Sequence, residues 1–219
     1  LNDNSELHII DYTINKSKFV NNVYENIIVE KNSKLKNLYI QSGKSYGYFH
    51  KFIKNKSSYN SDFLCMIFSS GLKFNKLDIE CDLNEEYSKC TILSALFLDK
   101  NEHQEIKTRV NHLAPNCKSY QKVKKVLSSE SKGVYQGKIY VKDVAQKTDA
   151  YQLSKAILLN DNTEFNSKPE LEIYADDVKC SHGSTSGNVE EESLYYLMTR
   201  GLSRKESLRL LINGFLNDI

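Results

Sequence analysis

An alternation of apolar and polar side chains with a period of two residues is the feature that most constrains this chain. In residues 77–83 (LDIECDL) the odd positions are apolar and the even positions are acidic, as in a strand with one buried and one solvated face. Similar segments recur at roughly ten-to-twenty-residue spacing, at 63–68, 92–98, 135–141 and 171–175. The pattern up to about residue 183 predicts a body of many short strands.

The connections between these strands carry few hairpin signals. The chain has only 2 prolines, and no Asn-Gly or Asp-Gly pair joins adjacent predicted strands, although tight hairpins prefer these dipeptides. A stack of coils linked by bends therefore fits at least as well as a β-sandwich. Residues 146–160 suit either a helix or strands, and the local pattern does not decide between them.

After residue 187 the pattern becomes helical. Asn188 followed by Glu191, and Ser203 followed by Glu206, each match a capping box, and Gly201 occupies the position where a left-handed residue ends a helix. Apolar residues then recur at three- and four-residue spacing: Leu194, Leu197, Met198, Leu208, Leu211, Ile212 and Phe215. This predicts a C-terminal helical hairpin whose apolar stripe either packs on the β body or docks a partner.

The charge balance argues against a nucleic-acid partner. The chain has 30 basic and 28 acidic residues and a net charge of +2, whereas nucleic-acid binding requires a marked basic excess or a basic stripe. The short basic group Lys122, Lys124 and Lys125 is expected to lie on a solvated strand face.

The cysteines indicate a reducing compartment. They are scattered, odd in number and form no C-x-x-C pair, which argues against a secreted disulfide framework and against a self-contained zinc site: Cys65, Cys81, Cys90, Cys117 and Cys180. No apolar run of about 18 residues and no signal segment appears, so we expect a soluble intracellular protein with no membrane partner. Because the chain begins at Leu1, we expect an N-terminal portion to be missing.

The stretch at 176–183 (DDVKCSHG) is the strongest candidate for metal chemistry. If it is extended, Cys180 and His182 point to the same side with their backbones about 7 Å apart, where a thiolate and an imidazole can reach one metal ion. Two ligands are too few for zinc or for a cluster iron. Alternatively, Cys180 is a small buried residue and His182 caps a turn before Gly183.

Other polar residues give weaker signals. Asp78, Glu80 and Asp82 form a row of carboxylates that is expected to be a solvated face; two of them could act on a sugar only at a suitable separation. No nucleotide-binding glycine motif and no G-x-S-x-G motif is present. Four histidines lie singly in polar contexts and receive no role: His8, His50, His103 and His112.

Several longer motifs follow one another between residues 112 and 215. They are HLAP (112–115), GVYQGKI (133–139), AQKTDAYQ (145–152), KPELEIYADDVKCSHG (168–183), EESLYYL (191–197) and LINGF (211–215). With these motifs the chain resembles the SufB/SufD family of iron–sulfur cluster assembly scaffolds, and its SufD branch more than its SufB branch. The first 100 residues match only weakly in detail.

The resemblance implies a mainly β fold: a right-handed parallel β-helix over residues 1–186, followed by a small C-terminal helical hairpin at 187–219. Residues 146–160 should then be strands. The N-terminal helical region of the family is expected to be absent from this sequence.

The resemblance also implies a non-catalytic scaffold subunit that pairs with SufB through the β-helix. The ATPase SufC is expected to bind the C-terminal helices at Leu194, Leu197, Leu208, Leu211 and Phe215. The protein is expected in the cytoplasm, or in the plastid stroma of a plastid-bearing eukaryote. The rival functions are a structural partner with a vestigial ligand site and a β-helical carbohydrate-active enzyme.

A nascent iron–sulfur cluster is expected at the interface with SufB. The resemblance makes His182 a ligand of the cluster or its iron, with Cys180 beside it in the same motif. The two ligands that are insufficient alone would then form half of a site between subunits. The resemblance also associates reduced flavin with the assembled complex.

Overall fold

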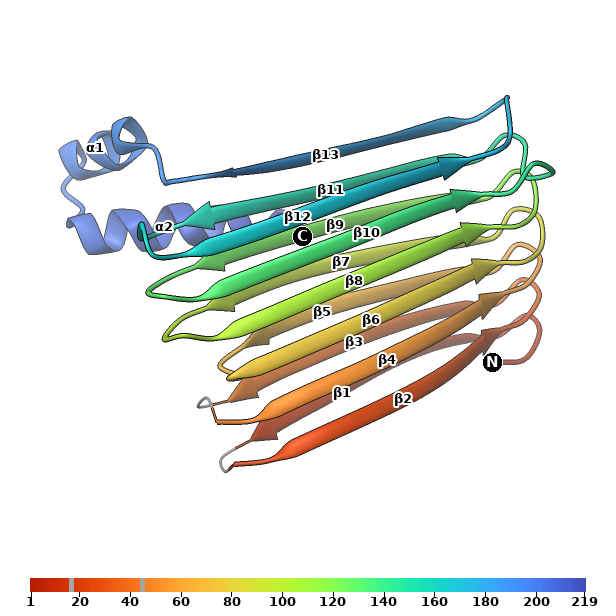
Figure 1. Cartoon of the computed structure of the whole chain (residues 1–219), viewed down its shortest axis with the longest axis horizontal. Helices are drawn as coiled ribbons and strands as arrows, with labels where there is room; N and C mark the ends of the chain where they lie inside the picture. The colour runs from red at the N-terminus through yellow and green to blue at the C-terminus, as the bar shows by residue number, and fades with distance from the viewer. Residues whose placement is uncertain (16–17, 44–45) are drawn as a thin grey trace.

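The computed structural model describes residues 1–15, 18–43 and 46–219, which form two parallel β-sheets and two C-terminal helices (Figure 1). We call the larger sheet, built from the odd-numbered strands, sheet A: β1 (Glu6–Asn15), β3 (Lys34–Gly43), β5 (Asp62–Ser70), β7 (Lys89–Leu98), β9 (Lys118–Leu127), β11 (Asp149–Leu158) and β13 (Lys179–Gly187). Sheet B contains the even-numbered strands: β2 (Val20–Val29), β4 (Tyr48–Ser57), β6 (Phe74–Leu83), β8 (His103–His112), β10 (Lys132–Val141) and β12 (Glu164–Ile173).

The chain winds between the two sheets as a solenoid, adding one strand to each sheet per coil. Every strand pairs in parallel with the strand two positions along the chain, so that Glu6 lies beside Lys34, 28 residues later. The sandwich alternative is wrong, because it would join neighbouring strands as antiparallel hairpins. The prediction of a parallel β-helix is confirmed, and so is the strand expected within residues 146–160, which is β11.

Single left-handed residues make the bends that precede the sheet A strands. Asn4, Asn32 and Asn60 have φ values of 56°, 57° and 50°, each two residues before a strand. Their side chains form a ladder: Asn32 Nδ2 donates to Asn4 Oδ1 at 3.1 Å, and Asn60 Nδ2 donates to Asn32 Oδ1 at 3.0 Å. The column of left-handed residues continues through Tyr87, Asn116 and Lys147. One such residue at each of these six bends, which precede β1, β3, β5, β7, β9 and β11, replaces the two-residue turn of a hairpin.

The period-two alternation buries one side of each strand in the space between the sheets. In β6 the apolar residues at 77, 79, 81 and 83 are buried, while the acidic residues between them are only partly covered. Four of the five cysteines are fully inside this core, and Cys180 is half-buried. The core also contains polar side chains, among them Gln121, Tyr135 and Gln152.

The expectation that Lys122, Lys124 and Lys125 form a solvated strand face is wrong. Lys125 points between the sheets and is fully buried, where its Nζ donates to the backbone oxygens of Gln104 at 3.0 Å and Val134 at 2.7 Å. Burial lowers the pKa of Lys125 to about 7. Lys124 points out of the solenoid but is buried because a C-terminal helix covers it.

His112, to which the sequence pattern assigned no role, is also buried. It lies at the end of β8 with its Nε2 2.9 Å from Ser119 Oγ. Burial lowers its pKa to about 4, so the imidazole is neutral near pH 7. His112 is therefore a structural element of the core.

The chain ends in helices α1 (Glu191–Thr199) and α2 (Arg204–Leu216). The capping box at Ser203 and Glu206 is confirmed, and Gly201 has a φ of 91° as expected. The box predicted at Asn188 is wrong, because α1 begins after Glu190 without a side-chain cap. Within the described ranges, neither helix is long and apolar enough to cross a membrane.

Candidate metal centre

Strand β13 ends sheet A and has a free edge (Figure 1). It pairs only with β11 among the described strands, from Lys179 beside Asp149 to Gly187 beside Ile157. Sheet B ends with β12, which contacts both β11 and β13, and no described strand of sheet B lies beyond it. The inner side of β13 therefore lies at an open end of the solenoid.

Cys180 and His182 lie on this inner side. Cys180 is paired with Ala150 and His182 with Gln152, and both β11 residues point into the core. Paired residues of neighbouring parallel strands point the same way, so the expected placement of Cys180 and His182 on one side of an extended segment is confirmed. His182 is exposed and makes no hydrogen bond or ion pair with the part of the chain that the structure describes. It does not cap a turn, because β13 continues to Gly187.

Cys180 is partly enclosed. It packs against a cluster at the end of the core that includes Val141, Ala150 and Ala175. Burial, and to a smaller extent the nearby Asp149 carboxylate, raise the pKa of the Cys180 thiol. A metal ion must therefore displace a proton to bind this sulfur.

Cys180 and His182 are too few donors to hold a metal ion by themselves. No group of three or more histidine, cysteine or acidic side chains suited to a metal ion occurs among residues 1–15, 18–43 and 46–219. A four-coordinate iron would leave at least two positions for ligands from another molecule. The geometry supplies two donors on an open, accessible strand.

The helical hairpin lies beside this open end and packs on sheet A (Figure 1). Leu194 of α1 is 2% exposed, and together with Leu158 and Leu208 it lines a cavity of about 150 Å³. Arg204 Nη2 pairs with Glu191 Oε1 at 2.7 Å and links the two helices. Leu194 is therefore used to hold the hairpin in place.

The end of α2 is attached to strand β9. Lys124 Nζ donates to the backbone oxygen of Phe215 at 2.6 Å and lies 4.7 Å from the centre of its ring. Lys122 and Lys124 both pair with Asp218 Oδ2 at 2.6 Å, and these contacts lower the pKa of Asp218 to about 2. Phe215 therefore faces the solenoid.

The hairpin still presents apolar surface to solvent. Leu197, Leu208 and Leu211 are half-buried, while the exposed apolar residues of the hairpin are Met198, which belongs to the predicted stripe, and Tyr195, Tyr196 and Leu210, which do not. The sequence did not indicate the last three because partner binding was assigned to the helical stripe. Apolar residues off the stripe were the available signal.

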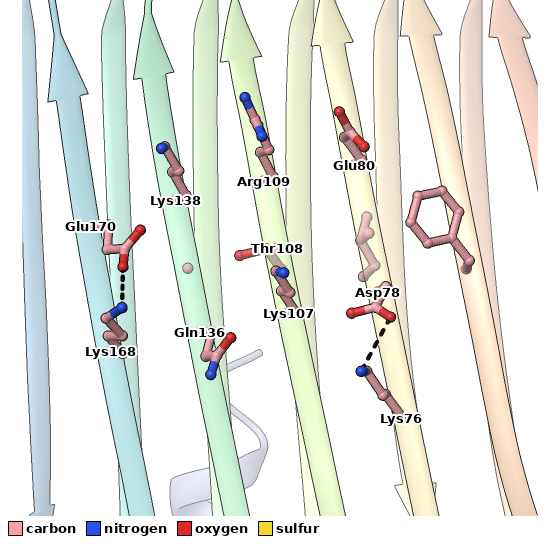
Figure 2. Close-up of a pocket in the computed structure, with 13 residues that line it drawn as sticks. Lys76, Asp78, Glu80, Lys107, Thr108, Arg109, Gln136, Lys138, Lys168 and Glu170 are labelled. Atoms are coloured by element: carbon pink, nitrogen blue, oxygen red, sulfur yellow. Dashed lines mark ion pairs between the residues drawn. The ribbon is translucent and has the colours of Figure 1, made fainter.

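A groove of about 470 Å³ crosses the outer face of sheet B (Figure 2). The acidic row of β6 lies along it, and its carboxylates are paired with cations. Asp78 Oδ2 lies 2.8 Å from His50 Nε2, and Lys54 Nζ lies 2.8 Å from Glu80 and 2.7 Å from Asp82. The expected solvated face is thus a partly covered, ion-paired surface.

Glu170 in this groove is unsuited to the role of the acid in sugar hydrolysis. That chemistry requires one carboxyl group kept protonated by its surroundings. In Figure 2 the groove carboxylates lie among lysines and Arg109, and the ion pair with Lys168 lowers the pKa of Glu170. Cations of this kind favour the ionised form of a carboxyl group.

Comparison with known proteins agrees with the fold and with the motifs around β13. Residues 1–215 match the family model described as SUF system FeS cluster assembly, SufBD core domain. The chain belongs to the SufBD family. The description of this family model is one of iron–sulfur cluster assembly.

The relatives include members from bacteria and a plant. The SufBD chain is 36% identical to the iron–sulfur cluster assembly protein SufD of Escherichia coli over 137 residues, covering 63% of this chain and 32% of that protein. It is 32% identical to a SufBD family protein of Synechocystis over 149 residues, covering 68% and 33%. It is 29% identical to the Arabidopsis thaliana protein ABCI7, chloroplastic, covering 99% and 46%.

These findings confirm the resemblance to the SufB/SufD family and its SufD branch. The SufBD chain spans between about a third and a half of the length of these relatives. The functions of its individual residues, its partners and its cellular location stay predictions.

Proposed function

We propose that this SufBD-family chain is a non-catalytic scaffold subunit that pairs with SufB and holds a nascent iron–sulfur cluster between the two chains. The cluster is cargo, and His182 contributes an imidazole ligand to it, with the Cys180 thiol beside it. The open inner side of β13 carries this proposal, since a ligand presented there is accessible to a second subunit.

The free edge of β13 supports the pairing. An edge strand presents unpaired backbone N–H and C=O groups that can accept another strand. We propose that SufB joins near this edge and supplies the remaining ligands. Docking and completion of the site would then occur together, because the ligands reach the metal only when the chains meet.

Anaerobic reconstitution with SufB and SufC tests the ligand role. His182→Ala should leave the β signal of the circular dichroism spectrum intact and lower the yield of cluster absorbance, and Cys180→Ala tests the second donor. His8→Ala is the matched control, because His8 is an exposed histidine on β1, the first strand of sheet A. A normal cluster yield in the double variant His182→Ala/Cys180→Ala, with SufB and SufC still bound, would instead favour a structural partner with a vestigial site.

We propose that residues 187–219 form the docking region for the ATPase SufC and residues 1–186 the scaffold core. Leu194 and Phe215 hold the hairpin on the solenoid, so they would act on docking through its position. Leu197, Leu208 and Leu211, together with exposed Tyr195 and Leu210, would meet the ATPase directly. ATP-driven movement of SufC would then reach the cluster site through α1, which directly follows β13.

A pull-down with SufC tests this docking region. Leu210→Asp should reduce recovery of the ATPase while circular dichroism stays unchanged, because Leu210 is 52% exposed. Leu7→Asp is the matched control, since Leu7 is a partly exposed leucine on β1. Full recovery with Leu210→Asp and with Tyr195→Asp would contradict the proposal. Reduced flavin in the assembled complex and a cytoplasmic or plastid location rest on the family resemblance.

A further inference from the structure

Two glutamines and His182 form one column on the inner side of sheet A. Gln121 of β9 is paired with Gln152 of β11, and Gln152 is paired with His182 of β13. Paired residues of adjacent strands are separated by about 4.8 Å and point the same way. Gln152 is therefore the residue immediately beneath His182 in the solenoid.

The side chain of Gln152 is buried but not hydrogen-bonded. Its exposed fraction is 0%, and neither its Oε1 nor its Nε2 has a partner within the described part of the chain. Gln121 Nε2 is likewise unpaired there. A buried amide atom without a partner destabilises the fold, so a glutamine at this position calls for a functional explanation.

Gly137 of β10 provides space for the Gln152 amide. A Cβ atom at Gly137 would lie 2.3 Å from Gln152 Nε2 and 2.5 Å from the Tyr135 hydroxyl. The Tyr135 hydroxyl in turn lies 3.5 Å from Gln121 Oε1. The amide of Gln152 thus lies in a polar part of the core, beside Gly137 and near the Tyr135 hydroxyl.

We propose that Gln152 is a positioning residue for His182, an inference that rests on the proposed ligand role of His182. The structure contains neither bond, but the register lets a turn of the two side chains bring Gln152 Oε1 to accept a hydrogen bond from His182 Nδ1–H while Gln152 Nε2 donates to Gln121 Oε1. This bond fixes the neutral imidazole as the Nδ1–H tautomer and leaves the Nε2 lone pair for iron. Metal-binding histidines generally hold their second ring N–H in this way.

The His182 tautomer can be measured directly in the intact protein labelled with ¹⁵N-histidine. At about pH 8, above the ordinary histidine pKa of about 6.5, two-bond ¹H–¹⁵N correlations distinguish the Nδ1–H from the Nε2–H form. The signals of His182 are those missing from His182→Ala. Wild-type protein should show Nδ1–H, and Gln152→Met, which keeps the side-chain length but removes the acceptor, should shift His182 to Nε2–H, the form that free imidazole side chains favour.

Two further variants sharpen the result. Gln152→Glu keeps an acceptor and should retain Nδ1–H, whereas Gln104→Met, the same change at another buried glutamine, should leave the His182 signals unchanged. Nε2–H in wild-type protein would overturn the inference without any variant. Nδ1–H that persists in Gln152→Met would also overturn it.

Cluster assembly with SufB and SufC provides the second readout. Gln152→Met should lower the apparent iron affinity or cluster yield about 10–100-fold, and Gln152→Glu should recover most of it. The ligand role of His182 and the positioning role of Gln152 can be contradicted independently. Normal cluster formation by His182→Ala removes the ligand role, while an unresponsive His182 tautomer removes the role of Gln152 even where His182→Ala abolishes assembly.

Discussion

Replacing Lys125 by methionine should change how the stability of the protein depends on pH. Lys125 is fully buried, and its Nζ contacts only backbone oxygens at 2.7 Å and 3.0 Å. Its pKa falls from the ordinary value of 10.5 to about 7, because the loss of hydration on burial outweighs the attraction of the Glu105 carboxylate. Methionine has a similar length and no charge, so it keeps the packing and removes the titration.

The sign follows from proton binding. Between about pH 7 and pH 10.5 the unfolded chain holds the Lys125 proton more tightly than the folded chain, so wild-type stability rises with pH. The slope is about 1.4 kcal/mol per pH unit within that window, which amounts to about 2 kcal/mol between pH 7 and pH 9. Below pH 7 both states are protonated, and the effect levels off.

Urea unfolding followed by circular dichroism at pH 7, 8 and 9 measures this slope. The wild-type free energy of unfolding should rise relative to Lys125→Met by about 2 kcal/mol over that range. Lys89→Met is the control, because Lys89 is exposed at the start of β7. Lys125→Met also loses the two hydrogen bonds of the lysine, which shifts its stability equally at all three pH values and leaves the difference in pH dependence intact. Parallel curves for wild type and Lys125→Met would refute the reasoning.

Three further changes test the fold. His112→Asn should reduce the loss of stability that the protein shows between pH 6.5 and pH 4. In the wild type this loss should be about 3 kcal/mol, because the folded pKa of the buried imidazole is about 4. Urea unfolding at pH 7, 5 and 4 measures the loss, and an equal loss in the variant argues against this explanation. Asn32→Ala should lower the free energy of unfolding by about 1–2 kcal/mol, because alanine disfavours the left-handed φ and removes the hydrogen bonds of the asparagine ladder. Asn32→Gly should lower stability less in thermal melts, since glycine tolerates that φ. Equal losses in the two variants would contradict the conformational explanation. Asp218→Asn should speed amide exchange in the last turn of α2 by releasing Lys122 and Lys124, whereas Asp161→Asn should not; equal exchange would exclude the anchor.

The sequence predicts the strands well, because alternation is local information. Residues 77–83 show the period plainly, and each of the other four segments overlaps a strand of the solenoid. The bends were harder to recognise, since those that precede β1, β3, β5, β7, β9 and β11 each use one left-handed residue in place of a dipeptide. The signal that was available is the 28-residue spacing of Asn4, Asn32 and Asn60, which equals the length of one coil.

Buried polar residues are the part that the sequence could not predict. A lysine within a basic run usually lies in solvent, and nothing local separates Lys125, which points into the core, from Lys122, which does not. The difference depends on the strand boundaries of β9 and on the carbonyl oxygens of β8 and β10 that reach Lys125. His112 was missed for the same reason, because its surroundings come from other coils.

The candidate site depends both on local sequence spacing and on contacts between coils. The side shared by Cys180 and His182 follows from their spacing, whereas Gln152 comes from 30 residues earlier and joins them only through the register of β11 and β13. A parallel solenoid converts such a separation into contact, because each coil places its inner residues directly over those of the coil before. No described strand lies above the last coil, so its inner residues become a surface. The stacking that packs a buried column inside the core therefore leaves His182 at the end of the core, and under the proposed function a second subunit would complete a metal site there.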